Sequence, residues 1–293
     1  MKFDWLHSAL SGTAIVMASA VVLPTIVVAL TPPEISKIAK EITVMIDTQS
    51  PGSGVIIGKK GRNYYVLTAW HVVKYVDWKY TVKTADEQRH PIDYSNVKRI
   101  PGVDLAVVQF TSDRNYSTAK LANSDELTEG TPVYIAGFPD PGADSQERIY
   151  KFTSGEISGL YRNKPLAGGY ALVYTNITRT GFSGSPVLDT NGNVVGIHGQ
   201  GESSQSTNNE SGESSGLKTG FNRGIPIKTF LDLAPKVGIN LNFDRIAQEK
   251  TPTSPPVSIA PSESTSTPGA LPNRPTRIRS SADTPICAAS RCE

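Results

Sequence analysis

The hydrophobic residues of this chain fall into one long run near the N-terminus and many short runs further along. The long run, residues 9–30, contains no charged residue. As a helix it would extend about 33 Å, enough to span a bilayer core of about 30 Å. A secretory signal cleaved after Val27-Val28-Ala29 and an uncleaved membrane anchor both fit this pattern. A buried core helix is disfavoured, because the run is apolar on every side. Both favoured interpretations predict that the following domain is exported.

After about Ile42 the pattern changes to short apolar runs separated by Gly, Pro and Asn, which is typical of β-strands. These runs span residues 55–57, 64–67, 80–82, 105–108, 133–135 and 194–197. Many short strands at nearly regular spacing predict an all-β domain with closed or packed sheets. Residues 225–234 have a spacing nearer to the helical period, and Pro226 fits a first helical turn. We therefore expect a short helix at the end of the domain.

Two further segments are too polar to contribute to a core. Residues 202–216 are mainly Ser, Asn, Glu and Gly, which predicts a mobile surface loop. Residues 251–293 are rich in Pro, Ser, Thr and Ala, which predicts disorder. For Cys287 and Cys292 in this tail, a small disulfide loop and two idle thiols remain equally open. The predicted organisation is an N-terminal signal or anchor at 1–40, a folded domain at 41–240 and a disordered tail at 241–293.

The composition narrows the classes of function. A net charge of +2 gives no electrostatic reason to expect a nucleic-acid partner. Both cysteines lie in the predicted tail, so the folded domain must be held by packing rather than by disulfides. No set of Cys and His residues has the spacing of metal ligands. We therefore expect neither a metal nor a cofactor.

Candidate chemistry centres on the stretch Gly181-Phe182-Ser183-Gly184-Ser185-Pro186. In a tight turn between two glycines, the serine hydroxyl faces outward while neighbouring N–H groups point at one spot. A nucleophile beside an oxyanion hole needs this arrangement. An ordinary turn rich in Gly, Ser and Pro has the same composition, so other parts of the chain must decide between the two interpretations.

Two other stretches supply what Ser183 would need. His71 follows an apolar strand, and Asp104 stands at the head of another one. Taken alone, a histidine among apolar residues is more often a core residue, and an aspartate before a strand is more often a turn residue. The order His, Asp, Ser along the chain is one of the few recurrent orders of a catalytic triad, so the three residues support one another.

The stretches around His71, Asp104 and Ser183 resemble the three motifs of the chymotrypsin-like serine peptidases. Over residues 41–234 the chain is most similar to the bacterial glutamyl endopeptidases among them. The resemblance implies an all-β fold of two antiparallel six-stranded β-barrels with a short C-terminal helix. It also implies that Ser183 is the nucleophile, His71 the general base and Asp104 the residue that orients the base. The backbone N–H groups of Gly181 and Ser183 would form the oxyanion hole.

The resemblance extends to substrate preference. Trypsin-like members hold an acid six positions before the serine, where this chain has Ile177, so a pocket for Lys or Arg is disfavoured. Glutamyl endopeptidases share a Thr or Ser five positions before the serine and a His fifteen after it; Thr178 and His198 match. A hydroxyl and an imidazole can each donate a hydrogen bond to a carboxylate. Phe182 replaces the aspartate through which trypsin-like enzymes are activated, so we do not expect that activation switch.

These features predict an exported serine endopeptidase that acts on proteins or peptides and cleaves after Glu, less readily after Asp. A heat-shock-type protease is disfavoured, because the residues after Ala234 are too few and too low in complexity for the peptide-binding domain that such proteases carry. The alternative from another class is an inactive two-barrel binding module, anchored in a membrane through residues 9–30. The complete set of three catalytic residues argues against that alternative.

Overall fold

The computed structural model describes residues 29–141, 145, 147–207 and 214–245. Residues 1–28 of the predicted signal or anchor lie outside the described residues, as do residues 246–293 of the predicted tail, with Cys287 and Cys292. None of the helices in the described part combines the length and the apolar character that crossing a bilayer requires.

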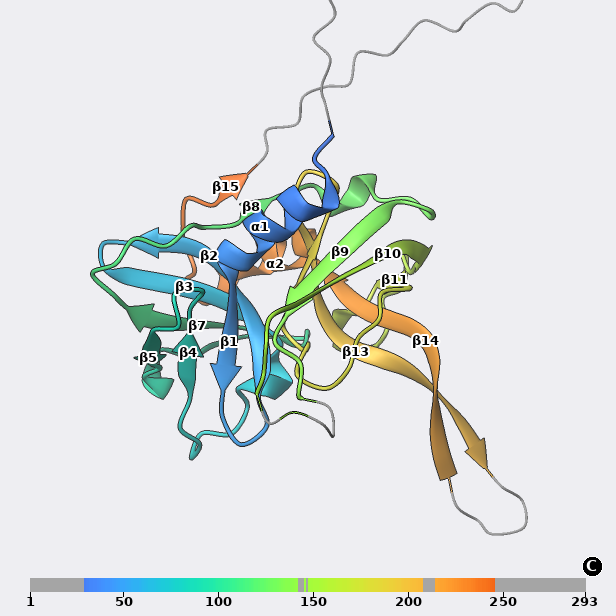
Figure 1. Cartoon of the computed structure of the whole chain (residues 1–293), viewed down its shortest axis with the longest axis horizontal. Helices are drawn as coiled ribbons and strands as arrows, with labels where there is room; N and C mark the ends of the chain where they lie inside the picture. The colour runs from blue at the N-terminus through green and yellow to red at the C-terminus, as the bar shows by residue number, and fades with distance from the viewer. Residues whose placement is uncertain (1–28, 142–144, 146, 208–213, 246–293) are drawn as a thin grey trace, which may run out of the picture. The chain divides into compact units, whose positions relative to one another are not determined.

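Seven antiparallel strands form the first sheet, in the order β5-β4-β1-β2-β3-β7-β6 (Figure 1). The strands are β1 (Thr43–Asp47), β2 (Gly52–Lys60), β3 (Asn63–Thr68), β4 (Thr81–Lys83), β5 (Arg89–Pro91), β6 (Lys98–Ile100) and β7 (Leu105–Thr111). The edge strands β5 and β6 have three residues each; β5 contains an arginine and a proline, and β6 a lysine and an arginine, residues that oppose further pairing. Among the described residues no pairing joins these two edges, so the sheet is an open half-barrel.

The second sheet closes on itself. Its strands are β8 (Lys120–Leu121), β9 (Pro132–Gly137), β10 (Lys151–Leu160), β11 (Leu172–Tyr174), β12 (Pro186–Leu188), β13 (Val194–Thr207), β14 (Ser214–Pro226) and β15 (Asp244–Arg245). Strand β12 pairs with both β9 and β13, which closes a six-stranded antiparallel ring in the order β12-β9-β10-β11-β14-β13. The two-residue strands β8 and β15 add parallel pairings outside this ring.

The predicted all-β chymotrypsin-like class is confirmed, and so is the short C-terminal helix, α2 (Ile227–Leu233). Of the two predicted six-stranded barrels, only the second closes. One helix was not predicted: α1 (Pro32–Ile42) buries Ile35, Ala39 and Ile42. The signal for its start is visible in the sequence, because Glu34 lies three residues after Thr31 and its carboxylate accepts the N–H of Thr31 at 2.8 Å.

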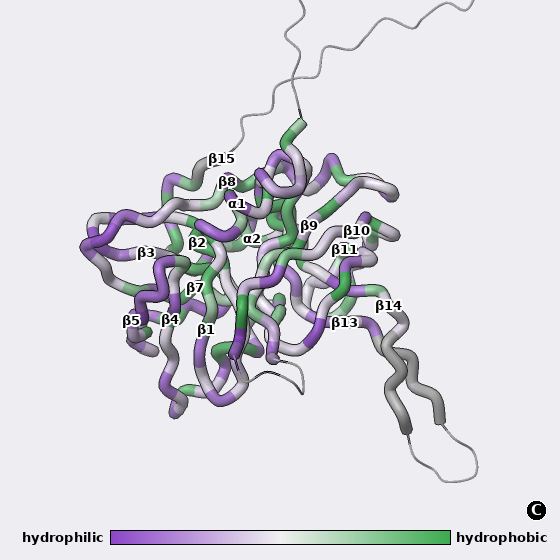
Figure 2. Tube along the Cα trace, viewed as in Figure 1, coloured by the Kyte–Doolittle hydropathy of each residue, from purple (hydrophilic) through white to green (hydrophobic). Residues whose placement is uncertain are grey.

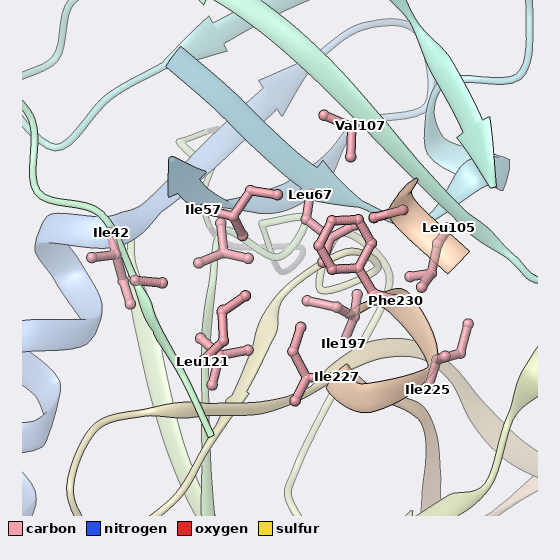
Figure 3. Packing of buried hydrophobic residues seen from close by; sticks show 14 of the residues in the cluster. Ile42, Ile57, Leu67, Leu105, Val107, Leu121, Ile197, Ile225, Ile227 and Phe230 are labelled. Atoms are coloured by element: carbon pink, nitrogen blue, oxygen red, sulfur yellow. The ribbon is translucent and has the colours of Figure 1, made fainter. Parts of the chain in front are cut away.

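The main hydrophobic core lies between the two sheets and the helices. Its members come from α1, from strands of both sheets and from α2, with Phe230 of α2 among the side chains at its centre (Figure 3). Hydrophobic residues concentrate along the inner parts of the strands, whereas the turns around β3 and β5 are hydrophilic (Figure 2). This shared core fixes the relative positions of the half-barrel and the barrel, because interior side chains pack at crystal-like density.

The prediction of a loop at 202–216 is wrong for its two ends. Residues 203–207 of β13 pair with 214–218 of β14, so they extend the hairpin beyond the ring (Figure 1). The physical reason is that this pairing uses backbone N–H and C=O groups, which every residue here carries. A polar sequence without alternating apolar residues therefore gave no strand signal.

Candidate active site

The loop around Ser183, residues 179–185, is called the serine loop below. Gly181 and Gly184 both have positive φ angles, of 93° and 87°. A Cβ atom at Gly184 would lie 2.1 Å from the carbonyl oxygen of Ser53 and 2.2 Å from the hydroxyl of Thr68. A Cβ atom at Gly181 would lie 2.7 Å from the backbone nitrogen of Asp140. Both positions therefore require glycine, on grounds of conformation and of space.

Ser53 on β2 connects the serine loop to the first sheet. Its N–H donates to the carbonyl of Ser183 at 2.8 Å, and its hydroxyl donates to the carbonyl of Gly181 at 2.9 Å. The same hydroxyl accepts the N–H of Phe138 at 2.9 Å. Ser53 is fully buried, so these bonds are shielded from water. Ser53 was not among the predicted site residues; the run of small residues at 52–54 is the signal in the sequence that indicates close backbone approach.

His71 and Asp104 lie side by side because their strands are neighbours. His71 stands in the 3-10 turn η1 (Trp70–Val72) that follows β3, and Asp104 immediately precedes β7, which pairs with β3. The Nδ1 atom of His71 lies 2.6 Å from Oδ2 of Asp104, and the His71 N–H donates to Oδ1 at 2.9 Å. The carboxylate thus orients both the backbone and the ring of His71.

Asp104 accepts a third hydrogen bond, from the hydroxyl of Tyr170 to Oδ2 at 2.5 Å. Burial by itself would raise the pKa of Asp104, but the hydrogen bonds and charge of His71, together with the Tyr170 hydroxyl, outweigh burial and hold the pKa below its usual value. Asp104 is therefore ionised at neutral pH. Tyr170 was not among the predicted site residues.

The hydroxyl of Ser183 donates to the carbonyl of Gly199 at 3.1 Å. Within the residues that the structure describes, no hydrogen bond joins this hydroxyl to the His71 ring. The structure thus brings His71 and Asp104 together, while the Ser183 hydroxyl has another acceptor. In substrate-free serine enzymes, catalytic hydrogen bonds are often long or misaligned and tighten only in the complex with substrate.

The predicted oxyanion-hole donors lie in the same loop. Phe182 donates its N–H to the carbonyl of Arg179 at 3.1 Å, and Ser185 donates its N–H to Phe182 at 2.9 Å. These bonds form the turn on either side of Ser183. In the described part of the chain, neither the N–H of Gly181 nor that of Ser183 donates a hydrogen bond. Both groups therefore have the hydrogen-bonding capacity that an oxyanion requires.

Thr178 and His198, the predicted specificity residues, are engaged separately. The Thr178 hydroxyl donates to the side-chain carbonyl of Asn222. His198 is only 2% exposed, and its Nδ1 lies 2.7 Å from the hydroxyl of Tyr174. Burial raises the pKa of Tyr174, so its hydroxyl keeps its proton.

A cavity of about 240 Å³ lies beside Thr178. Its lining consists of Thr175, Asn176, Ile177, Thr178, Gly201, Glu202, Gly220, Phe221 and Asn222. Glu202 places a carboxylate there, which accepts hydrogen bonds from Arg223 at 2.5 Å and from Thr219 at 2.9 Å. These bonds lower the pKa of Glu202. This acid comes from β13, 19 positions after Ser183, whereas trypsin-like members hold theirs six positions before the serine.

Residues 52–197 match the trypsin-like peptidase domain family. This chain contains a trypsin-like serine peptidase domain. The matched segment includes His71, Asp104 and Ser183 and confirms the prediction of a serine-type endopeptidase domain.

Curated relatives are of the HtrA type. A "Serine protease HtrA-like" protein of Staphylococcus aureus (strain USA300) is 30% identical over 164 residues, which are 50% of this chain and 19% of the relative. A "Probable periplasmic serine endoprotease DegP-like" protein of Pseudomonas fulva (strain 12-X) is 33% identical over 155 residues, 53% of this chain and 30% of the relative. The chain thus spans less than a third of the length of either relative.

Solved structures support the fold. The HtrA-type protease AlgW with a tripeptide has a TM-score of 0.55 at 23% identity, over 72% of this chain and 64% of that one. A form of AlgW with a decapeptide has a TM-score of 0.54 at 20% identity, over 71% of this chain and 67% of that one. At this level of identity the likeness concerns the fold.

The predicted resemblance is confirmed in part. Similarity to trypsin-like serine peptidases is confirmed, and the relatives are HtrA-like and DegP-like proteases. The HtrA-like and DegP-like names of the relatives give no support to the prediction that disfavoured a heat-shock-type protease, and this similarity covers only about half of the chain. A glutamyl endopeptidase specificity stays a prediction.

Proposed function

We propose that the chain is an exported serine endopeptidase in which His71, Asp104 and Ser183 form the catalytic triad. The observation that carries this proposal is the contact of 2.6 Å between His71 Nδ1 and Asp104 Oδ2, next to a serine loop that Ser53 ties to the same sheet. A partly buried carboxylate on Nδ1 leaves Nε2 as the proton acceptor of the neutral ring, as a general base requires.

The proposed reaction begins when the Ser183 hydroxyl turns from the Gly199 carbonyl to Nε2 of His71. This exchanges one hydrogen bond, worth about 0.5–1.5 kcal/mol net, for another. Ser183 Oγ then attacks the substrate carbonyl while His71 takes its proton, and Asp104 stabilises the imidazolium. The N–H groups of Gly181 and Ser183 would receive the developing oxyanion. His71 next protonates the leaving amine, and water releases the acyl group from Ser183 through the same steps.

Replacement of Ser183 by Ala tests this mechanism. The variant should lose hydrolysis and labelling by an organofluorophosphonate, which requires an activated serine. Ser117→Ala, an exposed serine on the first half of the chain, serves as the matched control and should keep both. Hydrolysis that persists in pure Ser183→Ala protein would refute the triad. A wild-type protein that neither cleaves nor is labelled would favour the inactive binding module.

We further propose cleavage after Glu, less readily after Asp. Thr178 lines the cavity beside the serine loop, and Ile177 is not an acid. In the tautomer in which Tyr174 donates to Nδ1 of His198, the proton of the ring is on Nε2, the form that donates to a carboxylate. Thr178 would have to release Asn222 to donate as well, which costs about one hydrogen bond.

Cleavage after an uncharged polar residue is a second candidate, which two observations favour. The Thr178 hydroxyl proton is already used by Asn222. The carboxylate of Glu202 lines the same cavity and would repel a substrate carboxylate. The two candidates differ in which substrate side chain the cavity accepts, and not in the reaction.

Peptides that differ only in the residue before the cut separate the two candidates. Selective cleavage of the Glu peptide over the Gln peptide supports the first candidate, and the reverse supports the second. Replacing His198 by Gln should then reduce kcat/KM for the Glu peptide about tenfold or more, the value of one charge-assisted hydrogen bond. An equal loss on Glu, Gln and Ala peptides would show that His198 is structural.

Export and membrane association through residues 9–30 are also proposals. They are supported by the apolar sequence of that segment and by the word periplasmic in the name of the Pseudomonas relative. Fractionation of cells that express the full chain tests both. Recovery of the protein in the cytoplasmic fraction would refute export, and recovery in the soluble exported fraction would refute the anchor.

A further inference from the structure

Tyr170 lies between the 3-10 turn η4 (Ala167–Gly169) and β11, and it is only 4% exposed. Its hydroxyl donates to Oδ2 of Asp104 at 2.5 Å, the same oxygen that contacts Nδ1 of His71. The side chain thus belongs to the second barrel, while the carboxylate it bonds precedes a strand of the first sheet. No motif in the sequence marks this residue.

The turn before Tyr170 also contacts Asp104, through its backbone. Gly168 has a φ of 80°, and its carbonyl accepts the N–H of Asp104 at 2.8 Å. The N–H of Leu166 donates to the carbonyl of Tyr170 at 2.8 Å, which closes the turn. Asp104 is therefore held at its backbone by Gly168 and at its carboxylate by Tyr170, both from one short segment.

Gly199 provides the space that the Tyr170 ring occupies. A Cβ atom at Gly199 would lie 2.2 Å from both the Cε1 atom and the hydroxyl of Tyr170. The carbonyl of Gly199 also accepts the hydroxyl of Ser183 at 3.1 Å. The phenol therefore bonds Asp104 at its hydroxyl and packs against Gly199, the residue whose carbonyl accepts the Ser183 hydroxyl.

We propose that Tyr170 is a positioning residue that acts through Asp104, holding the carboxylate against His71 and limiting how strongly the carboxylate attracts the imidazole proton. The inference rests on the triad of the proposed function. A second donor on Oδ2 shares the negative charge that Nδ1–H would otherwise face alone, because hydrogen bonds to a charged group stabilise that charge. Without the phenol, the imidazolium becomes more favourable, and the neutral base forms only at higher pH.

The phenol donates over the whole pH range of interest. Burial, together with the neighbouring Asp104 carboxylate, raises the pKa of Tyr170 far above its usual value. Three titratable groups among the described residues interact with this cluster. The Asp104 carboxylate acts on Tyr170, His71 acts on Asp104, and Tyr170 in turn helps burial to raise the pKa of Tyr174. In addition, Arg99 lies 5.0 Å over the ring of Trp70, next to His71.

The test is Tyr170→Phe, which keeps the ring against Gly199 and removes only the hydroxyl. We expect kcat to fall about three- to tenfold with KM within about twofold, and the acid midpoint of the kcat/KM profile to rise by about 0.5 pH unit, a fraction of the value of one charge-assisted hydrogen bond. The imidazole titration, followed by NMR on the resonance that disappears in His71→Gln, should move by the same amount.

Tyr64→Phe is the matched control. Tyr64 of β3 is also buried, and its hydroxyl donates at 2.8 Å to the carbonyl of Arg114, which follows β7 and takes no part in the proposed mechanism. Tyr64→Phe should lower the thermal midpoint as Tyr170→Phe does and leave both the pH profile and the imidazole titration unchanged. This separates loss of a buried hydroxyl in general from loss of the bond to Asp104.

An unchanged imidazole titration in folded Tyr170→Phe would overturn the inference. If that variant does not fold, 3-fluorotyrosine at position 170 replaces it: the stronger phenol donor should lower the titration midpoint, and an upward or absent shift would overturn the inference. The proposed function fails independently, if the wild type shows no hydrolysis that Ser183→Ala abolishes. The NMR titration still decides the role of Tyr170 in that case, because it does not depend on turnover.

Discussion

The first sheet and the second barrel contribute to the site in different ways. His71 and Asp104 of the first sheet flank paired strands, and they contact each other directly at 2.6 Å. Thr178 and His198 of the second barrel each bond a different neighbour, Asn222 and Tyr174. Groups at the ends of paired strands are positioned by backbone hydrogen bonds. The backbone of His198 is also held by β14 and by Ser185, but the direction of its ring, like that of the Thr178 hydroxyl, is set by a side-chain partner.

The largest expected effect lies in the first sheet. Asp104→Asn should lower kcat about 10⁴-fold, because an amide in place of the carboxylate favours the wrong tautomer of His71. KM should change little, since Asp104 does not face the substrate. Peptide hydrolysis measured beside Asp93→Asn, an exposed aspartate, checks the prediction. A loss of less than about tenfold would show that the contact between His71 and Asp104 is structural.

The next largest effect is expected for Ser53, which connects the first sheet to the serine loop of the second barrel. Ser53→Ala removes the hydroxyl that bonds Gly181 and Phe138. We expect kcat to fall about 10- to 100-fold, because the oxyanion donors of the serine loop lose support, and the free energy of unfolding to fall by about 1–3 kcal/mol. Steady-state kinetics and urea unfolding measure the two losses. A variant that loses stability but keeps full activity would show that Ser53 does not position the oxyanion donors of the serine loop.

A smaller effect is expected in the dependence of stability on pH. The hydrogen bonds from His71 and Tyr170 outweigh burial and lower the pKa of Asp104 in the folded state. Its contribution is therefore present above the unfolded pKa of about 4 and is lost as the pH falls through the folded value. As the pH falls from 5 through the folded pKa of Asp104, the free energy of unfolding of the wild type should decrease by about 1–2 kcal/mol more than that of Asp104→Asn. Parallel stability curves would contradict a lowered pKa of this carboxyl.

The smallest effect tests the pocket. Glu202→Gln should raise kcat/KM for a Glu peptide about threefold relative to a Gln peptide, because it removes a like charge that Arg223 already partly neutralises. Glu156→Gln, an exposed glutamate of β10, is the matched control and should leave the ratio unchanged. An unchanged ratio in Glu202→Gln would mean that the cavity does not receive the side chain before the cut.

The strand pattern and three short motifs identified the all-β class, the closing helix α2 and the peptidase domain. Helix α1 was missed, because its residues directly follow the long apolar run and only the Thr31–Glu34 capping pair marks its start. The extension of the β13–β14 hairpin was missed because polar residues carry no strand signal. Ser53 and Tyr170 were missed because each acts on residues more than 60 positions away.

By itself, the sequence determined which residue types are available: a serine between two glycines, a histidine and an aspartate beside apolar strands, and strands short enough for a barrel. Local periodicity and turn chemistry depend on near neighbours, so they can be read along the chain. Only the tertiary structure decided that one sheet closes and the other stays open, that Ser53 holds the serine loop, and that Tyr170 reaches Asp104. Those contacts depend on strand pairing and core packing between distant segments, which no local pattern encodes.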